Sequence, residues 1–587
     1  MSIDCVRRPH HAARLHQPRM TLCAAAAALA LLATATASAA EPAVPQVPDN
    51  VKAAAAAINA DAKMQALLKE LTSPEAQKER FNNLVEIARI ASPSRFEMRR
   101  QAEITKRLTA EWGFDAKDIS TQLDGVLPGA GLQIVDGVPV YNVCVVIPGI
   151  YKNQADAKSY KGQFAKVLME GHIDSVNPGV LPPENRPYEP VKLQPASAPI
   201  VKSREELAAL PDELHFDKAG RVIEDEQYKR AYQRYASLED AQKKGGVRLY
   251  VPGITDAMIN TVAVMQAAQL MKKHGITPVY DIWVCGTAGE EGKGNLCGMK
   301  QLYGYSQGAG KGNNALNFVA NFAADSTNPG SGTVNYLGSY RFEIEYAEPE
   351  GFAYGDAARP SALSAMSRAI AAIADIKTPW DLDKKAERTT YTVGKAECTK
   401  PEAGKRSTHC TLMVDMRSPT QPPLSAIRAQ IEPQFKKALD AENAAYGLKA
   451  GDKNAVSMKL VWFGDRPASQ RTRYDDVAVT AWWEASRLAG VDVIDGMKLR
   501  ASSLNDNVPA AVGVPTINMN VGTPAARGGG HTWYEWGIPG DGVAEGKRIY
   551  KMVLSALIAS GYKTADGKVI APAADPIGPR TTEEMFK

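Results

Sequence analysis

Short apolar runs alternate with segments of helical spacing along most of the chain. Strands are expected at Pro139–Ile147, Phe164–Gly171, Val279–Cys285, Ala315–Ala323 and Thr516–Val521. Helices are expected at Val51–Leu71, Pro74–Ala91 and Ala257–Lys273. Apolar strands that alternate with helices are typical of an open, mostly parallel sheet with helices on both faces. The sequence therefore predicts an α/β fold with a doubly wound sheet.

Residues 338–466 follow a different rhythm. The expected order is strand, helix, strand, strand, helix, strand, at Tyr340–Tyr346, Ser361–Ile373, Thr389–Cys398, Cys410–Arg417, Ser425–Ala444 and Met458–Phe463. A β-α-β-β-α-β order is the ferredoxin-like pattern. We expect this stretch to be a domain inserted into a larger α/β domain made of residues 41–337 and 467–587.

The segment 177–250 is expected to elaborate the face of the larger domain. It is Pro-rich at first, then charged, with helical spacing around Glu224–Lys244. We expect the segment to lie over the catalytic face and to shape the substrate pocket.

Residues 1–40 are typical of a signal peptide. Arginines precede the apolar run Leu22–Ala33, and Ala37-Ser38-Ala39 forms a small-residue cleavage motif. A retained membrane anchor is the alternative, which the cleavage motif disfavours. No later stretch reaches about 18 apolar residues, so no membrane span is expected. The protein is predicted to be exported, to the periplasm or outside the cell.

Composition and charge limit the classes of protein to which this chain can belong. The 587 residues are 44% hydrophobic and 23% charged, as in ordinary globular proteins. The net charge is +4, and residues 1–40 supply +3 of it through four arginines and Asp4, which leaves about +1. Nothing in this charge balance indicates a nucleic-acid-binding protein, which would need a basic face.

Five cysteines lie outside the predicted leader. Cys398 and Cys410 end and begin two expected strands, so a hairpin would bring them into disulfide distance. Cys285 and Cys297 form a second, weaker candidate pair. For each cysteine the alternative is a small buried apolar residue.

Several residues suited to metal chemistry lie at strand ends or helix starts. His172 and Asp174 follow an apolar strand on the same side, where Asp174 could orient the imidazole; a simple hydrogen-bonded pair is the alternative. Asp256 lies at a helix start, and Asp325 ends the expected strand Ala315–Ala323. The carboxyl ends of strands are where open α/β sheets bind ligands.

Two further positions extend this set. Glu290 and Glu291 follow a buried strand between glycines, and a cation or a shared proton would relieve their repulsion; a solvated charge pair is the alternative. His531 follows three glycines, which allow a close backbone approach or simply form a flexible loop. Imidazole and carboxylate ligands suit zinc, or less selectively cobalt or manganese.

The order of these motifs resembles the co-catalytic di-zinc exopeptidases and deacylases, a family that includes peptidase T, glutamate carboxypeptidase, carnosine dipeptidase, succinyl-diaminopimelate desuccinylase and aminoacylase. The resemblance extends from about residue 80 onward. The matching motifs are Gly171-His172-Ile173-Asp174, Asp256, Glu290-Glu291-Gly292, Asp325, Asp415-Met416-Arg417, Ser503-Leu504-Asn505-Asp506-Asn507 and His531-Thr532-Trp533-Tyr534-Glu535.

The resemblance implies a role for each position. Asp256 would bridge two zinc ions. His172 and Asp325 would complete one ion, and Glu291 and His531 the other. Glu290 would be the general base, and Asp174 would position His172. Arg466 resembles a position that holds a terminal carboxylate in some members, although an exposed boundary arginine is an equal alternative.

The resemblance also implies an activity. We expect an exported zinc metallopeptidase that hydrolyses short peptides, as an exopeptidase or dipeptidase. An N-acyl-amino-acid deacylase on the same centre is the alternative, and a non-catalytic binding protein is a weaker one. A homodimer through the inserted domain is also implied.

Two departures from the family pattern concern the site. The residues after Asp256 lack the family's Lys and Gly, and the region 351–365 lacks the histidine that often stabilises the oxyanion, so that role stays open. No G-x-S-x-G motif supports a serine hydrolase.

Overall fold

The computed structural model describes residues 44–579, apart from 121–133, 136–137, 140–141, 177–190, 306–311, 326–331, 350–358, 385–387, 401–406, 470–473, 492–500 and 523. The predicted signal peptide, residues 1–40, lies outside the described residues. Within the described part, no helix combines the length and apolar character that a membrane crossing requires.

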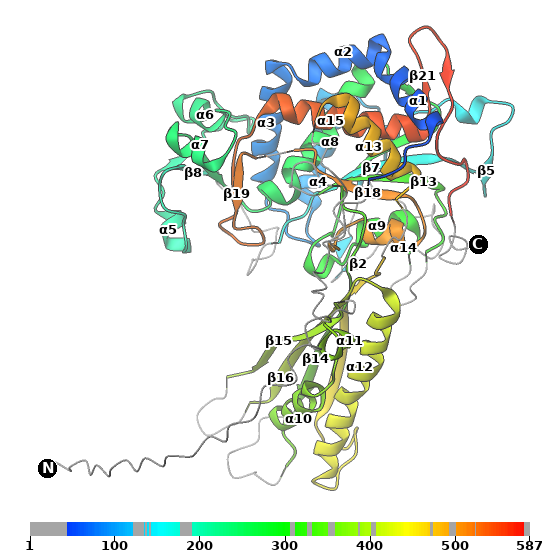
Figure 1. Cartoon of the computed structure of the whole chain (residues 1–587). Coiled ribbons are helices and arrows are strands. Elements are labelled where there is room, and N and C mark those ends of the chain that lie inside the picture. Colours follow the sequence, from blue (N-terminus) through cyan, green and yellow to red (C-terminus); the bar gives the residue numbers. More distant parts are fainter. Residues whose placement is uncertain are drawn as a thin grey trace, which may run out of the picture. The chain divides into compact units, whose positions relative to one another are not determined.

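A six-stranded sheet forms the centre of the larger α/β unit (Figure 1). Its strands, in spatial order, are β1 (Ile119–Ser120), β4 (Val143–Ile147), β12 (Asp281–Thr287), β7 (Lys166–His172), β13 (Phe318–Ala324) and β18 (Thr516–Met519). The last four run parallel to one another. At the other edge, β4 runs antiparallel to both of its neighbours, β1 and β12. Every residue of β7 is buried, as its continuous apolar run predicts.

Helices cover both faces of this sheet. Val167 and Met169 of β7 belong to the large core formed with helices of one face, whereas Leu168 belongs to a second core with helices of the other. The first face carries α1 (Asp49–Ala60), α2 (Ala62–Leu71), α3 (Pro74–Ala88), α8 (Ile259–Lys273), α13 (Val477–Ala489) and α15 (Gly542–Ser560). The second carries α9 (Cys297–Tyr303) and α14 (Asn507–Ala511). The predicted α/β class is confirmed.

The helix expected over Val51–Leu71 is two helices. Asp61 separates α1 from α2 with an extended backbone, and its side chain accepts a hydrogen bond from the Lys63 amide. An aspartate that caps a helix in this way starts a new helix.

Residues 338–466 build a four-stranded antiparallel sheet with its own hydrophobic core. Its strands, in spatial order, are β15 (Thr390–Cys398), β16 (His409–Ser418), β14 (Gly338–Ala347) and β17 (Ser457–Arg466). Its helices are α10 (Ala362–Ala374), α11 (Pro379–Leu382) and α12 (Gln421–Ala444). Apart from the short α11, the order of elements is the ferredoxin-like one expected. The role of this stretch as a lid or dimerisation domain stays a prediction.

Residues 191–250 extend a second sheet next to the chain that carries His531. This sheet has the order β19 (Ala526–Gly528), β20 (Trp536–Ile538), β10 (Val247–Tyr250), β8 (Lys192–Pro195) and β9 (Asp212–Glu213). The segment also holds α5 (Arg204–Ala208), α6 (Glu226–Ala231) and α7 (Leu238–Lys243), the last two within the stretch Glu224–Lys244 that was expected to be helical. His531 lies between β19 and β20, so this segment supports the loop that carries it.

Two disulfides join paired strands. Cys398 and Cys410 lie opposite each other in β15 and β16 and are bonded. The weaker expectation of a Cys285–Cys297 bond is wrong. Cys285 is bonded to Cys144, its antiparallel neighbour on β4, and Cys297 is a buried free thiol. The register of the sheet decides this pairing, and the register cannot be read from cysteine spacing.

Candidate metal centre

The carboxyl ends of three parallel strands meet at the candidate site. His172 is the last residue of β7, Asp325 directly follows β13, and Glu290 and Glu291 lie in the loop after β12. Asp256 lies in the turn that precedes α8. Neighbouring parallel strands place their carboxyl ends at one edge, so residues more than 80 positions apart in the sequence come together here.

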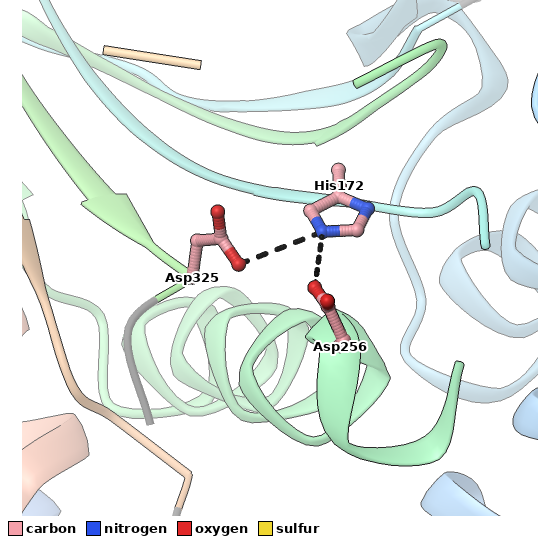
Figure 2. A group of neighbouring side chains, drawn as sticks. All are labelled: His172, Asp256 and Asp325. Carbon is pink, nitrogen blue, oxygen red and sulfur yellow. Dashed lines mark hydrogen bonds and ion pairs between the residues drawn. The ribbon is translucent and has the colours of Figure 1, made fainter. Parts of the chain in front are cut away.

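The first group of ligand atoms lies around His172. Its Nε2 is 3.3 Å from Oδ1 of Asp256 and 3.6 Å from Oδ1 of Asp325 (Figure 2). The imidazole is fully buried. One nitrogen and two carboxylate oxygens therefore lie close enough together to bind one ion.

The second group lies around His531. Its Nε2 is 2.9 Å from Oδ2 of Asp256 and 3.2 Å from Oε1 of Glu291. Asp256 therefore presents one oxygen to each histidine, which is the arrangement of a bridging carboxylate.

The donor set fits divalent cations. Within each of the groups His172–Asp256–Asp325 and Asp256–Glu291–His531, the ligand atoms lie within 4.8 Å of one another. Hydrogen bonds to Asp256 and Glu291 raise the pKa of His531 to about 11, because negative charge is concentrated there. Imidazole nitrogens among carboxylate oxygens suit zinc and its first-row neighbours.

Asp174 connects the two loops that carry the ligands. Its Oδ1 is 3.3 Å from Nδ1 of His172, and its carboxylate accepts hydrogen bonds from the amides of Glu290 at 3.0 Å and Glu291 at 2.9 Å. Burial disfavours the charged form, but the hydrogen bonds with His172 and the Glu291 amide outweigh it and hold the pKa of Asp174 below its usual value. This geometry suits the positioning role predicted for Asp174.

Glu290 is buried beside Arg466. The Arg466 guanidinium donates to Oε1 of Glu290 at 2.9 Å, to the Glu290 carbonyl, and to Oγ of Ser503 at 3.0 Å. Burial raises the pKa of Glu290 well above its usual value, Arg466 opposes that change, and the charge of Glu291 adds to it. Arg466 lines the cavity as a predicted substrate contact would, but its guanidinium is engaged with the predicted base.

Glu535 is a buried residue to which the sequence motif gave no role. Its carboxylate accepts hydrogen bonds from the amides of Gly253 and Thr255 at 2.7 Å each, from the Thr255 hydroxyl at 2.7 Å, and from the Asp256 amide at 3.1 Å. Burial raises the pKa of Glu535 to about 7, and the nearby charge of Asp256 adds to the effect. Glu535 therefore anchors the turn that presents Asp256.

A cavity of about 540 Å³ opens over these groups. Its lining includes the predicted base and ligands Asp256, Glu290, Glu291, Asp325 and His531. The lining residues from 338–466 are Arg341, Met413, Asp415, Arg417, Phe463 and Arg466. The cavity therefore combines the candidate metal centre with side chains from the inserted stretch.

Several arginine side chains line this cavity. Arg341 and Arg417 both pair with Asp415, at 3.2 and 2.9 Å, so two cations share one carboxylate. Arg527 also lines the cavity. The Asp415-Met416-Arg417 motif pointed to this strand, but neither arginine was predicted as a site residue.

The aromatic residues after His531 pack into the protein. Trp536 is buried, and the guanidinium carbon of Arg248 lies 4.7 Å from the centroid of its indole ring. Trp533 and Tyr534 pack against the hydrophobic cluster that contains Trp536. The described lining of the cavity includes none of the three.

Comparison with known proteins connects this fold to dipeptidases. No protein-family model matches the chain, and a search of curated proteins finds no match. Human carnosine dipeptidase 1 is similar in structure at 12% sequence identity, over 84% of this chain and 99% of that chain, with a TM-score of 0.50. The Saccharomyces cerevisiae di-peptidase Dug1p is similar at 12% identity, over 84% and 98%, also with a TM-score of 0.50. A Staphylococcus aureus tripeptidase matches at 14% identity, over 82% and 97%, with a TM-score of 0.47. The chain shares the fold of the two dipeptidases, and this is the fold that the sequence resemblance implied.

Proposed function

We propose that this protein is an exported di-zinc hydrolase that cleaves amide bonds of short peptides near one terminus. The observation that carries the proposal is Asp256, whose two oxygens face the imidazoles of His172 and His531 separately. A carboxylate placed in this way would be shared by two ions, with Asp325 on one side and Glu291 on the other. Cobalt or manganese could occupy the same ligands.

Two ions held here would acidify a water molecule and polarise the scissile carbonyl. The buried carboxylate of Glu290 takes a proton from the attacking water and delivers it to the leaving amine. Its raised pKa suits both steps, because a base with a very low pKa holds a proton poorly. Arg466 keeps the Glu290 carboxylate in one orientation.

We propose that the substrate carries a free carboxylate. Arg341 and Arg417 share Asp415, which leaves positive charge in the cavity, and the fork of an arginine suits a carboxylate. Arg466 is less suited to this task, because its two terminal nitrogens already donate to Glu290 and Ser503. A free carboxylate is common to dipeptides and N-acyl amino acids, so the deacylase activity is the second candidate.

Export is supported by the bonds Cys144–Cys285 and Cys398–Cys410, because disulfides persist mainly in oxidising compartments. Dimerisation through residues 338–466 is a further part of the proposal. Native mass spectrometry of the purified protein would test it.

The experiment is a product screen by mass spectrometry with zinc-loaded protein. Its substrates are di- and tripeptides, their N-acetylated and C-amidated forms, and N-acyl amino acids. We expect cleavage of substrates with a free carboxylate, and a loss of about 10²–10⁴-fold in kcat with Glu290→Ala. Cleavage of free-amine peptides alone would indicate a dipeptidase or aminopeptidase, and cleavage of acylated substrates would indicate the deacylase.

Arg417→Gln refines the assignment. It should raise KM for the carboxylate substrate about 10-fold or more and leave kcat nearly unchanged. If protein that binds two ions cleaves none of these amides, the proposed activity on short peptides is wrong, and an unusual amide substrate or a binding protein takes its place.

A further inference from the structure

The segment from Ser92 to Arg100 runs between the two loops that carry the candidate ligands. Next to the first loop, the Ser175 amide donates to the Ser92 carbonyl at 2.9 Å, and the Ser94 amide donates to the Ser175 carbonyl at 3.3 Å. Pro93 and Ser175 form an isolated parallel bridge. The segment thus continues the pairing of the chain beyond the end of β7.

Arg100, on α4 (Met98–Lys106), fixes the first loop through main-chain atoms. Its guanidinium is fully buried and donates to the carbonyl of Ile173 at 2.7 Å, and also to the carbonyls of Ala88 and Ile90 at 2.9 and 2.6 Å. The Ser92 hydroxyl donates to the same Ile173 carbonyl at 3.0 Å. Ile173 lies between His172 and Asp174, so these contacts set the backbone from which both side chains project.

Glu97 and Ser94 fix the second loop. The Glu97 Oε1 accepts from the Gly289 amide at 2.9 Å, and the Ser94 hydroxyl donates to the Glu291 carbonyl at 2.8 Å. Glu97 is almost fully buried. The two contacts hold the backbone on either side of Glu290.

Strand pairing alone does not fix these loops. The ladder between β7 and β12 ends at the pair His172 and Thr287, so beyond that pair the spacing of the two loops depends on other contacts. Asp174 supplies some of them, through its hydrogen bonds to the Glu290 and Glu291 amides. The segment 92–100 supplies a second set, because Arg100 binds the first loop and Ser94 and Glu97 bind the second.

We propose that Ser94, Glu97 and Arg100 are positioning residues that set the spacing between the His172 loop and the Glu290–Glu291 loop, and hence the geometry of the two ion sites. This proposal rests on the proposed function, because it assumes that the two loops bind metal. Partners that orient metal ligands typically change metal affinity by 10–100-fold when they are removed.

The test measures metal binding as well as activity. Glu97→Met removes the acceptor of the Gly289 amide, whereas Glu97→Gln keeps an acceptor oxygen of the same reach. The matched control is Arg107→Lys, because Arg107 is also buried and directly follows α4. Its side chain hydrogen-bonds Asn83, Glu86 and Glu103, none of which lies in either loop. Each variant is compared by chelator-buffered zinc titration, by the visible absorption of the cobalt-substituted protein, and by thermal unfolding without metal.

We expect Glu97→Met to weaken zinc binding by 10–100-fold and to change the cobalt spectrum, with Glu97→Gln within about threefold of the wild type. Arg107→Lys should lower the unfolding temperature without changing either metal readout. If Glu97→Met does not fold, Ser94→Ala replaces it, with an expected loss of about 3–10-fold in zinc affinity.

A folded Glu97→Met, or in its place Ser94→Ala, with wild-type zinc affinity and cobalt spectrum would overturn the positioning role alone. So would an equal loss of affinity in Arg107→Lys, because the effect would then be general destabilisation. A wild-type protein that takes up no divalent ion would overturn the proposed function, and the positioning role with it.

Discussion

Lys300 offers a direct test of how burial of a charge affects this protein. It lies on α9, is almost fully buried, and among the described residues its ammonium has no hydrogen-bond partner. The Tyr305 ring centroid is 6.0 Å from Nζ. Burial lowers the pKa of Lys300 from 10.5 to about 8, and the favourable charge of Asp465 does not compensate for it.

The size of the effect follows from that pKa. At about 1.4 kcal/mol for each pKa unit, a change from 10.5 to about 8 means that the charged ammonium destabilises the folded protein by about 3 kcal/mol at pH 7. Methionine fills similar space without the charge. Because packing will not be ideal, we expect Lys300→Met to be more stable than the wild type by about 1–3 kcal/mol at pH 7.

The pH dependence has a defined sign. The pKa is lower in the folded protein than in the unfolded chain, so the folded protein binds fewer protons between pH 8 and pH 10.5. Wild-type stability relative to Lys300→Met therefore rises across this window. The advantage of the variant should be complete below pH 8 and absent above about pH 10.5.

Urea unfolding of both proteins from pH 6 to pH 10.5 measures this difference. The matched control is Lys166→Met: the pKa of Lys166 is also lowered to about 8, mainly by burial, but its ammonium donates to Gln163, Phe164 and Leu316 at 3.0 Å each. Lys166→Met should not stabilise the protein at pH 7, because it leaves those acceptors unpaired. A Lys300→Met variant that is less stable than the wild type at pH 7, or a difference that does not vary with pH, would refute the reasoning.

Three further outcomes are expected. Glu535→Gln places an amide group against the N–H of Gly253, and should lower the free energy of unfolding by about 1–3 kcal/mol in urea titrations; an unchanged value would contradict the contacts. Removal of the Cys144–Cys285 bond, which spans 141 residues, should lower the free energy of unfolding by about 5 kcal/mol. Removal of the Cys398–Cys410 bond, which spans 12, should lower it by about 3 kcal/mol, and calorimetry of the two double-alanine variants would rank the two effects. Removal of metal with a chelator should lower the unfolding temperature and added zinc should restore it, whereas a temperature insensitive to both would argue against metal at the centre.

The sequence was most informative where a buried strand contains a continuous apolar run. The run Val167-Leu168-Met169 predicts β7, and both neighbours of that run in the sheet were predicted as well. The predicted strands stop short at their carboxyl ends, since β7 continues to His172 and β12 to Thr287. Both end residues are polar and buried, so hydrophobicity alone excludes them from a strand. His172 belongs to the candidate site, and the Thr287 hydroxyl donates to Glu170.

The helix break at Asp61 shows a different limit. Apolar spacing continues on both sides of this residue, so periodicity predicts one helix over Val51–Leu71. The break depends on one side chain that caps the second helix, a contact worth about 1 kcal/mol. A cap of this kind is a single local contact, which the periodicity of apolar residues does not describe.

In the candidate site, the ligand residues could be predicted from the sequence, but many of the partners that hold the site residues could not. His172, Asp256, Asp325 and His531 could be proposed because their residue types and order carry the chemistry, and the structure brings these side chains together. Some groups that hold the site residues in place lie far away in the sequence, such as Arg466, which binds Glu290 across 176 positions. A buried charge requires a partner, but which of many distant charges supplies it depends on the fold. Sequence reasoning therefore left Arg466 between a substrate contact and an exposed boundary residue, and could not consider the third role, which is to hold the base.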